Sequence, residues 1–215
     1  FSLIIAALYP FVKCTLSSSS CECPAPETFL LQDPNYFGFR DPWPFLTSPD
    51  RLYLKYGPLK LLENIQCIIS GLIKYDRSSG DVERNVSWTN IGEQPSRESI
   101  NVDLEGTKKS KSEVTATTTR FGSHDFNTVY SDPRCLVLRI SQTEKKVPFR
   151  SCLLWVKEPF LKNPLRHCRF LFDVFCNWNR VDLKPEKDCD KGVEKKDERP
   201  TRAGNQNSGT NRPPR

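Results

Sequence analysis

Nine cysteines in a chain of 215 residues constrain the fold more than any other feature of this sequence. If Cys14 is removed with a leader segment, an even set remains, and an even set in a secreted chain implies disulfides. A zinc site is not favoured, because Cys21 and Cys23 form the only close pair and His124 and His167 are not at ligand spacing. The eight remaining cysteines are Cys21, Cys23, Cys67, Cys135, Cys152, Cys168, Cys176 and Cys189.

Residues 1–14, FSLIIAALYPFVKC, are apolar from Phe1 to Val12. We interpret them as an N-terminally incomplete secretory signal, and a buried N-terminal strand or helix is the alternative. No apolar run approaches the roughly 20 residues of a membrane span, so none is predicted. The sequon Asn85-Val86-Ser87 predicts N-glycosylation at Asn85 and places that segment on the surface.

The net charge of +6 could suggest a nucleic-acid partner, but half of it comes from residues 190–215, which carry seven basic and four acidic side chains. That segment has almost no apolar side chains to offset the entropy of ordering it. We therefore predict a disordered basic tail over 190–215, either solvated or attracted to anionic surfaces, and no nucleic-acid binding.

Alternating apolar and polar residues predict short strands along most of the chain. From Pro164 the apolar spacing changes to that of a helix. Many short strands followed by one helix favour a closed antiparallel barrel with the helix outside, preceded by a polar, proline-rich lead-in at 15–39. The predicted strands are 51–57, 64–76, 84–91, 112–121, 127–141 (two runs separated by a Ser-Asp-Pro-Arg turn) and 149–158.

The period of two also predicts which side chains face inward. Arg139 marks its face of the strand as outward, and Cys135 lies on that face. If Cys152 also faces outward to meet the helix, the opposite faces of both strands point into the barrel. Cys168 and Cys176, eight residues apart, would lie on one side of the helix. The predicted interior residues are Leu136, Leu138, Ile140, Leu153 and Trp155.

The segments VYSDPRCLVLRI (129–140), CLLW (152–155) and HCRFLFDVFC (167–176), followed by a last cysteine, resemble the secreted salivary lipocalins of ticks, the histamine-binding family. The resemblance covers residues 40–189 and implies an all-β fold: an eight-stranded antiparallel lipocalin barrel with an interior cavity and an outer C-terminal helix. It implies the disulfides Cys67–Cys189 and Cys135–Cys168, and leaves Cys152–Cys176 by elimination. Cys21 and Cys23 remain to pair together, to pair between chains or to be cleaved away.

Amine-binding members of this family carry Cys-Asp-aliphatic, then Glu-Leu-aromatic, then Cys. Here the frame is intact, but Leu136 occupies the aspartate position and Leu153 the glutamate position. A buried amine cation needs a carboxylate or an aromatic cage, and two leucines supply neither. The resemblance and this substitution together predict an apolar ligand such as a fatty acid or eicosanoid. Its carboxylate would need a cation near the mouth, for which the sequence offers Lys55, Lys74, Arg120 and Arg139.

Two alternatives stay open. Amines could be held by other carboxylates, such as Asp103, Glu105 or Glu113. A barrel with a filled core could act on a host protein through its surface. An enzyme is not predicted, because no GxSxG, HExxH or P-loop motif is present. No cofactor or metal is expected. The predicted role is that of a secreted protein that sequesters a small hydrophobic or amine mediator of the host and so blunts host defence.

Overall fold

The computed structural model describes residues 30–92, 95–107, 110–141, 150–161, 165–176, 180–183 and 189. The predicted signal at 1–14, most of the lead-in, Cys21, Cys23 and the tail at 190–215 lie outside the described residues.

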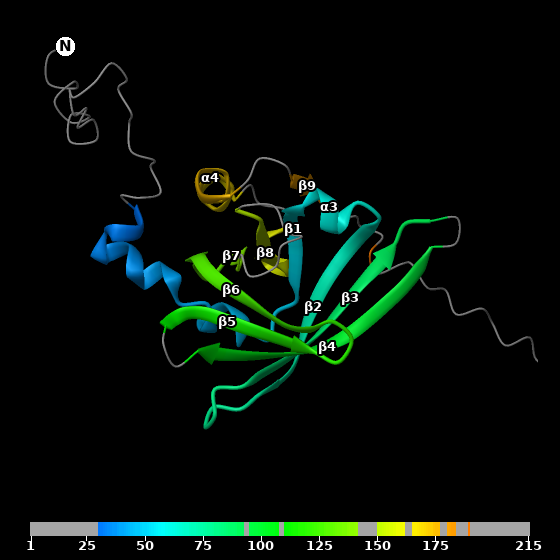
Figure 1. Ribbon diagram of the computed structural model, residues 1–215, viewed down its shortest axis with the longest axis horizontal. Helices are drawn as coiled ribbons and strands as arrows, with labels where there is room; N and C mark the ends of the chain where they lie inside the picture. Colours follow the sequence, from blue (N-terminus) through cyan, green and yellow to red (C-terminus); the bar gives the residue numbers. More distant parts are fainter. Residues whose placement is uncertain are drawn as a thin grey trace, which may run out of the picture.

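Eight antiparallel strands form a closed barrel (Figure 1). Neighbours run in the order β2-β3-β4-β5-β6-β7-β8-β1, and β1 closes the ring by pairing Leu52 with Ser70 and Tyr53 with Ile69 of β2. The expected eight-stranded antiparallel barrel is confirmed, and a short ninth strand adds to β1. The strands are β1 (Leu52–Pro58), β2 (Ile65–Tyr75), β3 (Val82–Asn90), β4 (Ser96–Thr107), β5 (Ser110–Thr118), β6 (Gly122–Ser131), β7 (Cys135–Ile140), β8 (Cys152–Lys157) and β9 (Arg180–Asp182).

The sequence patterns did not predict β4, which pairs with both β3 and β5. Its apolar residues Ile100, Val102 and Leu104 do alternate with polar ones, but they are diluted by charged and small residues over twelve positions. Tertiary pairing with two neighbours supplies the backbone hydrogen bonds that a weakly patterned strand needs.

Within the described residues, short helices accompany the barrel: η2 (Pro34–Arg40), α2 (Trp43–Leu46), α3 (Leu59–Leu62), η3 (Glu158–Phe160) and α4 (Arg166–Phe175). The segment η2 packs against the barrel wall, where the hydroxyl of Tyr36 donates a hydrogen bond to the carbonyl of Val129. Burial raises the pKa of Tyr36 to about 12, although the nearby cations Arg40 and Arg139 work in the opposite direction.

The helix α4 lies outside the barrel over β7 and β8 (Figure 1). Its buried face, Cys168, Phe172 and Phe175, packs on the outward side chains of those strands. The Arg139 side chain, predicted to face outward, donates a hydrogen bond of 2.7 Å to the carbonyl of Phe175. The disulfides Cys135–Cys168 and Cys152–Cys176 join this helix and its C-terminal end to the wall.

A third disulfide joins Cys67 to Cys189, 122 residues later in the chain. Cys67 lies where the pairing of β2 with β3 shifts register, and its φ of 52° is in the left-handed region. A bulge of this kind locally redirects a side chain of a strand. Two of the three pairs, Cys67–Cys189 and Cys135–Cys168, are those that the family resemblance implies, and Cys152–Cys176 is the pair that was left by elimination.

Candidate functional site

The barrel encloses an apolar cavity of about 340 Å³. Fourteen of the 18 residues that line it are hydrophobic, and the other four are Ser70, Arg84, Thr118 and His124. None of these lining residues is an aspartate or a glutamate. This volume is within the usual size range of small-ligand sites, about 300–1,000 Å³.

The structure places the five predicted interior residues in different surroundings. Leu138, Leu153 and Trp155 line the cavity. Leu136 is fully buried in the apolar cluster of Phe45, Leu46 and Leu52 and is not among the residues that line the cavity. Ile140, at the end of β7, is half-buried and also is not a lining residue. The register explains the difference, because each step of two along β7 moves a side chain further along the barrel axis.

Arg84 closes the deep end of the cavity and is almost fully buried. Its five N–H groups all donate to protein: Nε to the Ser70 hydroxyl, Nη1 to the carbonyls of Leu46 and Ser48, and Nη2 to the carbonyls of Asp50 and Ser70. The carbonyls of Leu46 and Ser48 are at and just beyond the C-terminal end of α2, where helix carbonyls lack partners of their own. Burial lowers the pKa of Arg84 to about 10, and Asp50 partly offsets this, so the group stays charged at neutral pH.

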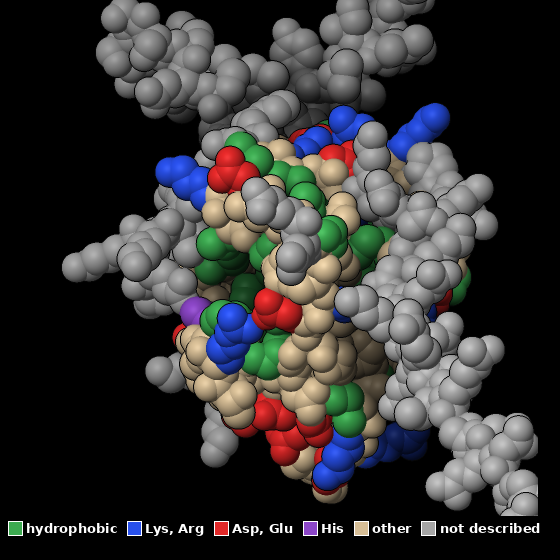
Figure 2. Space-filling model, turned by 90° about the vertical axis from the view of Figure 1, so that its right-hand side faces the viewer, with side chains coloured by type: hydrophobic (Ala, Val, Ile, Leu, Met, Phe, Trp, Pro, Cys, Tyr) green, Lys and Arg blue, Asp and Glu red, His purple; other side chains and the backbone are tan. Residues whose placement is uncertain are grey.

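The mouth of the cavity lies where Phe121, 53 % exposed, contributes to the lining. Figure 2 shows a hollow lined by hydrophobic side chains, with acidic and basic side chains beside it. In the turn between β5 and β6, the guanidinium of Arg120 lies 5.1 Å from the centre of the Phe121 ring. This brings one of the four cations named from the sequence to the mouth.

Arg120 pairs with Glu98 of β4, with 2.7 Å between Nη1 and Oε2. Glu98 lies directly opposite Trp88, which lines the cavity, so both side chains share the inner face of the β3–β4 hairpin. The amide of Asn90 donates a 2.7 Å hydrogen bond to Glu98 and accepts one from the Trp88 indole. The hydrogen bonds from Arg120 and Asn90 hold the pKa of Glu98 below its usual range.

Sequence reasoning missed Glu98 because β4 was not predicted as a strand. The carboxylates proposed as alternative amine ligands, Asp103, Glu105 and Glu113, are not among the lining residues. Asp103 and Glu105 flank the inward-facing Leu104, and both are exposed. The alternation of apolar and polar residues around Leu104 places Asp103 and Glu105 on the outer face once this segment is taken as a strand.

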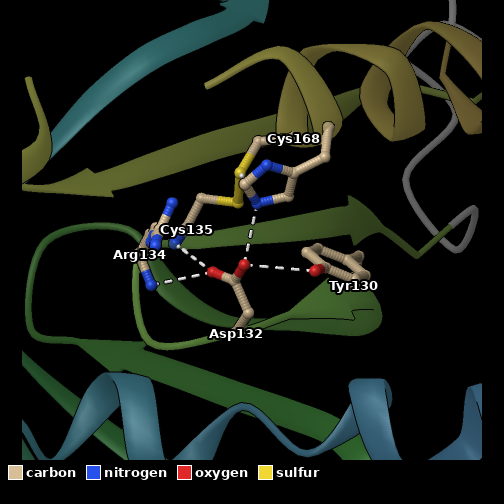
Figure 3. The surroundings of a disulfide bond; sticks show 6 residues. Tyr130, Asp132, Arg134, Cys135 and Cys168 are labelled. Carbon is tan, nitrogen blue, oxygen red and sulfur yellow. Dashed lines mark hydrogen bonds and ion pairs between the residues drawn. A yellow bond between two sulfur atoms is a disulfide. The ribbon is translucent and has the colours of Figure 1, made fainter. Parts of the chain in front are cut away.

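Asp132, Cys135, His167 and Cys168 offer metal-ligand atoms within 4.8 Å of one another. The two sulfurs are bonded to each other, so neither is available as a thiolate. The Asp132 carboxylate accepts hydrogen bonds from Tyr130, His167 and two backbone N–H groups, those of Arg134 and Cys135 (Figure 3). The geometry is that of a hydrogen-bonded turn that holds α4 to the β6–β7 connection.

Asp132→Asn is expected to lower the free energy of unfolding at neutral pH by about 1–3 kcal/mol, because charged hydrogen bonds are lost. Partial burial acts to raise the pKa of Asp132, but the hydrogen bonds from Cys135, Arg134, His167 and Tyr130 outweigh it and hold the pKa low. A carboxyl whose pKa is depressed on folding stabilises above its unfolded pKa of about 3.9, and this contribution is lost as the pH falls through the folded value.

The difference between the two proteins in urea denaturation should therefore shrink as the pH falls below about 4. Asp103→Asn, at an exposed position, serves as the control and should leave stability nearly unchanged. A difference that stays constant down to about pH 2.5 would show that the Asp132 charge is unimportant.

Comparison with known proteins bears on what the cavity is for. The sequence pattern of the family described as tick histamine binding protein matches residues 30–191. The chain belongs to the tick histamine-binding protein family. Among curated proteins, the comparison finds no match. This family membership and the barrel identify a ligand-binding kind of protein.

Solved structures resemble the barrel at low sequence identity. Japanin from Rhipicephalus appendiculatus bound to cholesterol is 16 % identical with a TM-score of 0.56, over 67 % of this chain and 97 % of that one. Lobster apocrustacyanin A1 is 12 % identical with a TM-score of 0.43, over 74 % of this chain and 85 % of that one. At these identities the likeness to Japanin shows the lipocalin fold alone. No helix in the described part of this family member is long and apolar enough to cross a membrane.

Proposed function

We propose that this histamine-binding family member is a secreted carrier that sequesters an apolar small molecule of the host, such as a fatty acid or eicosanoid, and so blunts host defence. The observation that carries the proposal is the composition of the cavity wall, 14 hydrophobic residues of 18 with no carboxylate among them. Family membership and the three disulfides support an extracellular role.

The expected contributions to the binding free energy favour an apolar ligand over an amine. Burial of each methylene contributes about 0.8 kcal/mol, so ten buried methylenes offer roughly 8 kcal/mol before the cost of association. A cation placed against Trp155 would gain only about 0.5–2 kcal/mol. No lining residue of the cavity is a carboxylate that could balance its desolvation, and Glu98 at the mouth is already paired with Arg120. The open volume of the cavity likewise weighs against a filled core that acts only through the barrel surface.

Titration calorimetry with arachidonic acid, histamine and serotonin tests the proposal. We expect the fatty acid to bind with a submicromolar Kd and the two amines to bind far more weakly. Submicromolar binding of either amine, or no binding of the fatty acid, would contradict it.

A variant that fills the cavity tests whether the ligand binds inside the barrel. Ala116→Phe places a ring inside the barrel, where free volume exists, and should weaken fatty-acid binding at least about tenfold without loss of stability. Thr117→Phe is the matched control, because Thr117 is the next residue of β5 and faces the outer side. Equal effects of the two variants on binding would place the ligand outside the barrel.

A further inference from the structure

An ion pair between Glu98, on the inner face of the β3–β4 hairpin, and Arg120, in the β5–β6 turn, lies at the mouth of the apolar cavity. The Glu98 carboxylate and the Arg120 guanidinium are both partly open to solvent, with 36 % and 61 % of their side chains exposed. An exposed pair of this kind adds little to stability, so a ligand can replace it at little cost.

The pair discriminates against ligands with a single charge. A bare carboxylate that approaches Arg120 meets Glu98 2.7 Å from the same cation, and a bare amine that approaches Glu98 meets Arg120. Each of these two ligands gains one attraction and suffers one repulsion, and the repulsion between like charges lowers its affinity. A head group with both charges can place each one against its opposite.

The deep end of the cavity offers no competing place for a polar head. All five N–H donors of Arg84 are already used by protein acceptors. Between that floor and the mouth, the lining residues are mostly hydrophobic. An amphiphile would therefore bind with its chain inward and its head at the Arg120–Glu98 pair.

We propose that the mouth binds the head group of a zwitterionic single-chain amphiphile of the phosphocholine type, with its phosphate on Arg120 and its quaternary ammonium between Glu98 and Trp88. Aromatic faces beside a carboxylate are the usual partners of quaternary ammonium groups, and guanidinium is a strong partner of phosphate. The inference rests on the proposed function, because the chain of the amphiphile must occupy the apolar cavity.

Three ligands with the same chain separate the charge of the head from the burial of the chain: dodecylphosphocholine, dodecanoic acid and dodecylamine. Titration calorimetry at pH 7.4, below each critical micelle concentration, should give dodecylphosphocholine an affinity at least about tenfold higher than the other two.

Variants at the pair predict opposite changes in this order. Glu98→Gln leaves the cation and should make dodecanoic acid the preferred ligand, whereas Arg120→Gln leaves the carboxylate and should favour dodecylamine. The double variant should bind all three with similar affinity. Glu105→Gln, on the outer face of the same strand, and Arg77→Gln, at an exposed turn, are the matched controls and should keep the wild-type order.

The inference is overturned if the wild type binds the three ligands equally, prefers a singly charged one, or keeps its order in both single variants. In each of those cases the proposed apolar-ligand function stands, since the alkyl chains of the ligands still bind. If none of the three binds, both the function and the inference fail.

Discussion

Replacement of Cys67 and Cys189 by alanine is expected to lower the free energy of unfolding by about 4–5 kcal/mol, the largest effect of any change considered for this protein. The two residues are 122 positions apart, so their disulfide restricts most of the described chain, from residue 67 to 189, in its unfolded state. Alanine suits the site better than serine, because the bond packs beside Tyr53 and Ile69, both buried.

The pair Cys152 and Cys176 provides a matched comparison within the same molecule, since it spans only 24 positions. The chain-entropy relation predicts that its removal costs about 1.4 kcal/mol less than removal of Cys67–Cys189. Urea denaturation of the two double variants measures the difference. If the shorter loop costs as much as the longer one, core packing around the helix α4 outweighs loop entropy.

Arg84→Met should cost about 3–5 kcal/mol, a large part of the stability of a typical domain, because each buried acceptor left without a donor costs about 1–3 kcal/mol. Methionine has similar length and suits an apolar cavity floor, but it leaves the carbonyls of Leu46, Ser48, Asp50 and Ser70 without the N–H donors they have now. Buried carbonyls without a donor lose their hydration on folding and gain no hydrogen bond in return. This desolvation cost makes the substitution destabilising and determines the size of the loss in stability.

Two further variants isolate the cause. Arg84→Lys keeps the charge but has three donors in place of five, so it should recover only part of the lost stability. Arg77→Met, at an exposed turn, should be nearly neutral. A loss of less than about 1 kcal/mol in Arg84→Met would mean that the α2 segment and the end of the barrel rearrange to satisfy these carbonyls in another way.

Local patterns were enough to predict the class of fold and the faces of its most regular strands. Cys152 and Trp155 occupy opposite faces of a strand because side chains alternate, whatever the rest of the chain does. That alternation places Leu153 and Trp155 on the inner face, where the structure has them on the cavity wall. The same alternation did not predict the strand β4, because polar residues dominate its sequence.

The positions of Leu136 and Leu153 along the barrel axis do not follow from local pattern. Leu136 and Leu153 both occupy acidic positions of the family motif, yet only Leu153 reaches the cavity, because Leu136 lies against Phe45 and Leu52. Alternation predicts which face of a strand a side chain occupies. It does not predict how far along the barrel axis that side chain lies, which depends on how α2 covers the deep end of the cavity.

By itself the sequence determined the number of cysteines, the β-barrel class and, through its resemblance to the family, the leucines at the amine-binding positions. These are matters of residue identity and of short-range periodicity. Only the tertiary structure decided that Arg84 satisfies the carbonyls around α2 and that Glu98 meets Arg120 at the mouth. Both depend on the register of strands that are far apart in the chain, and register is set when the barrel closes and buries its inner face.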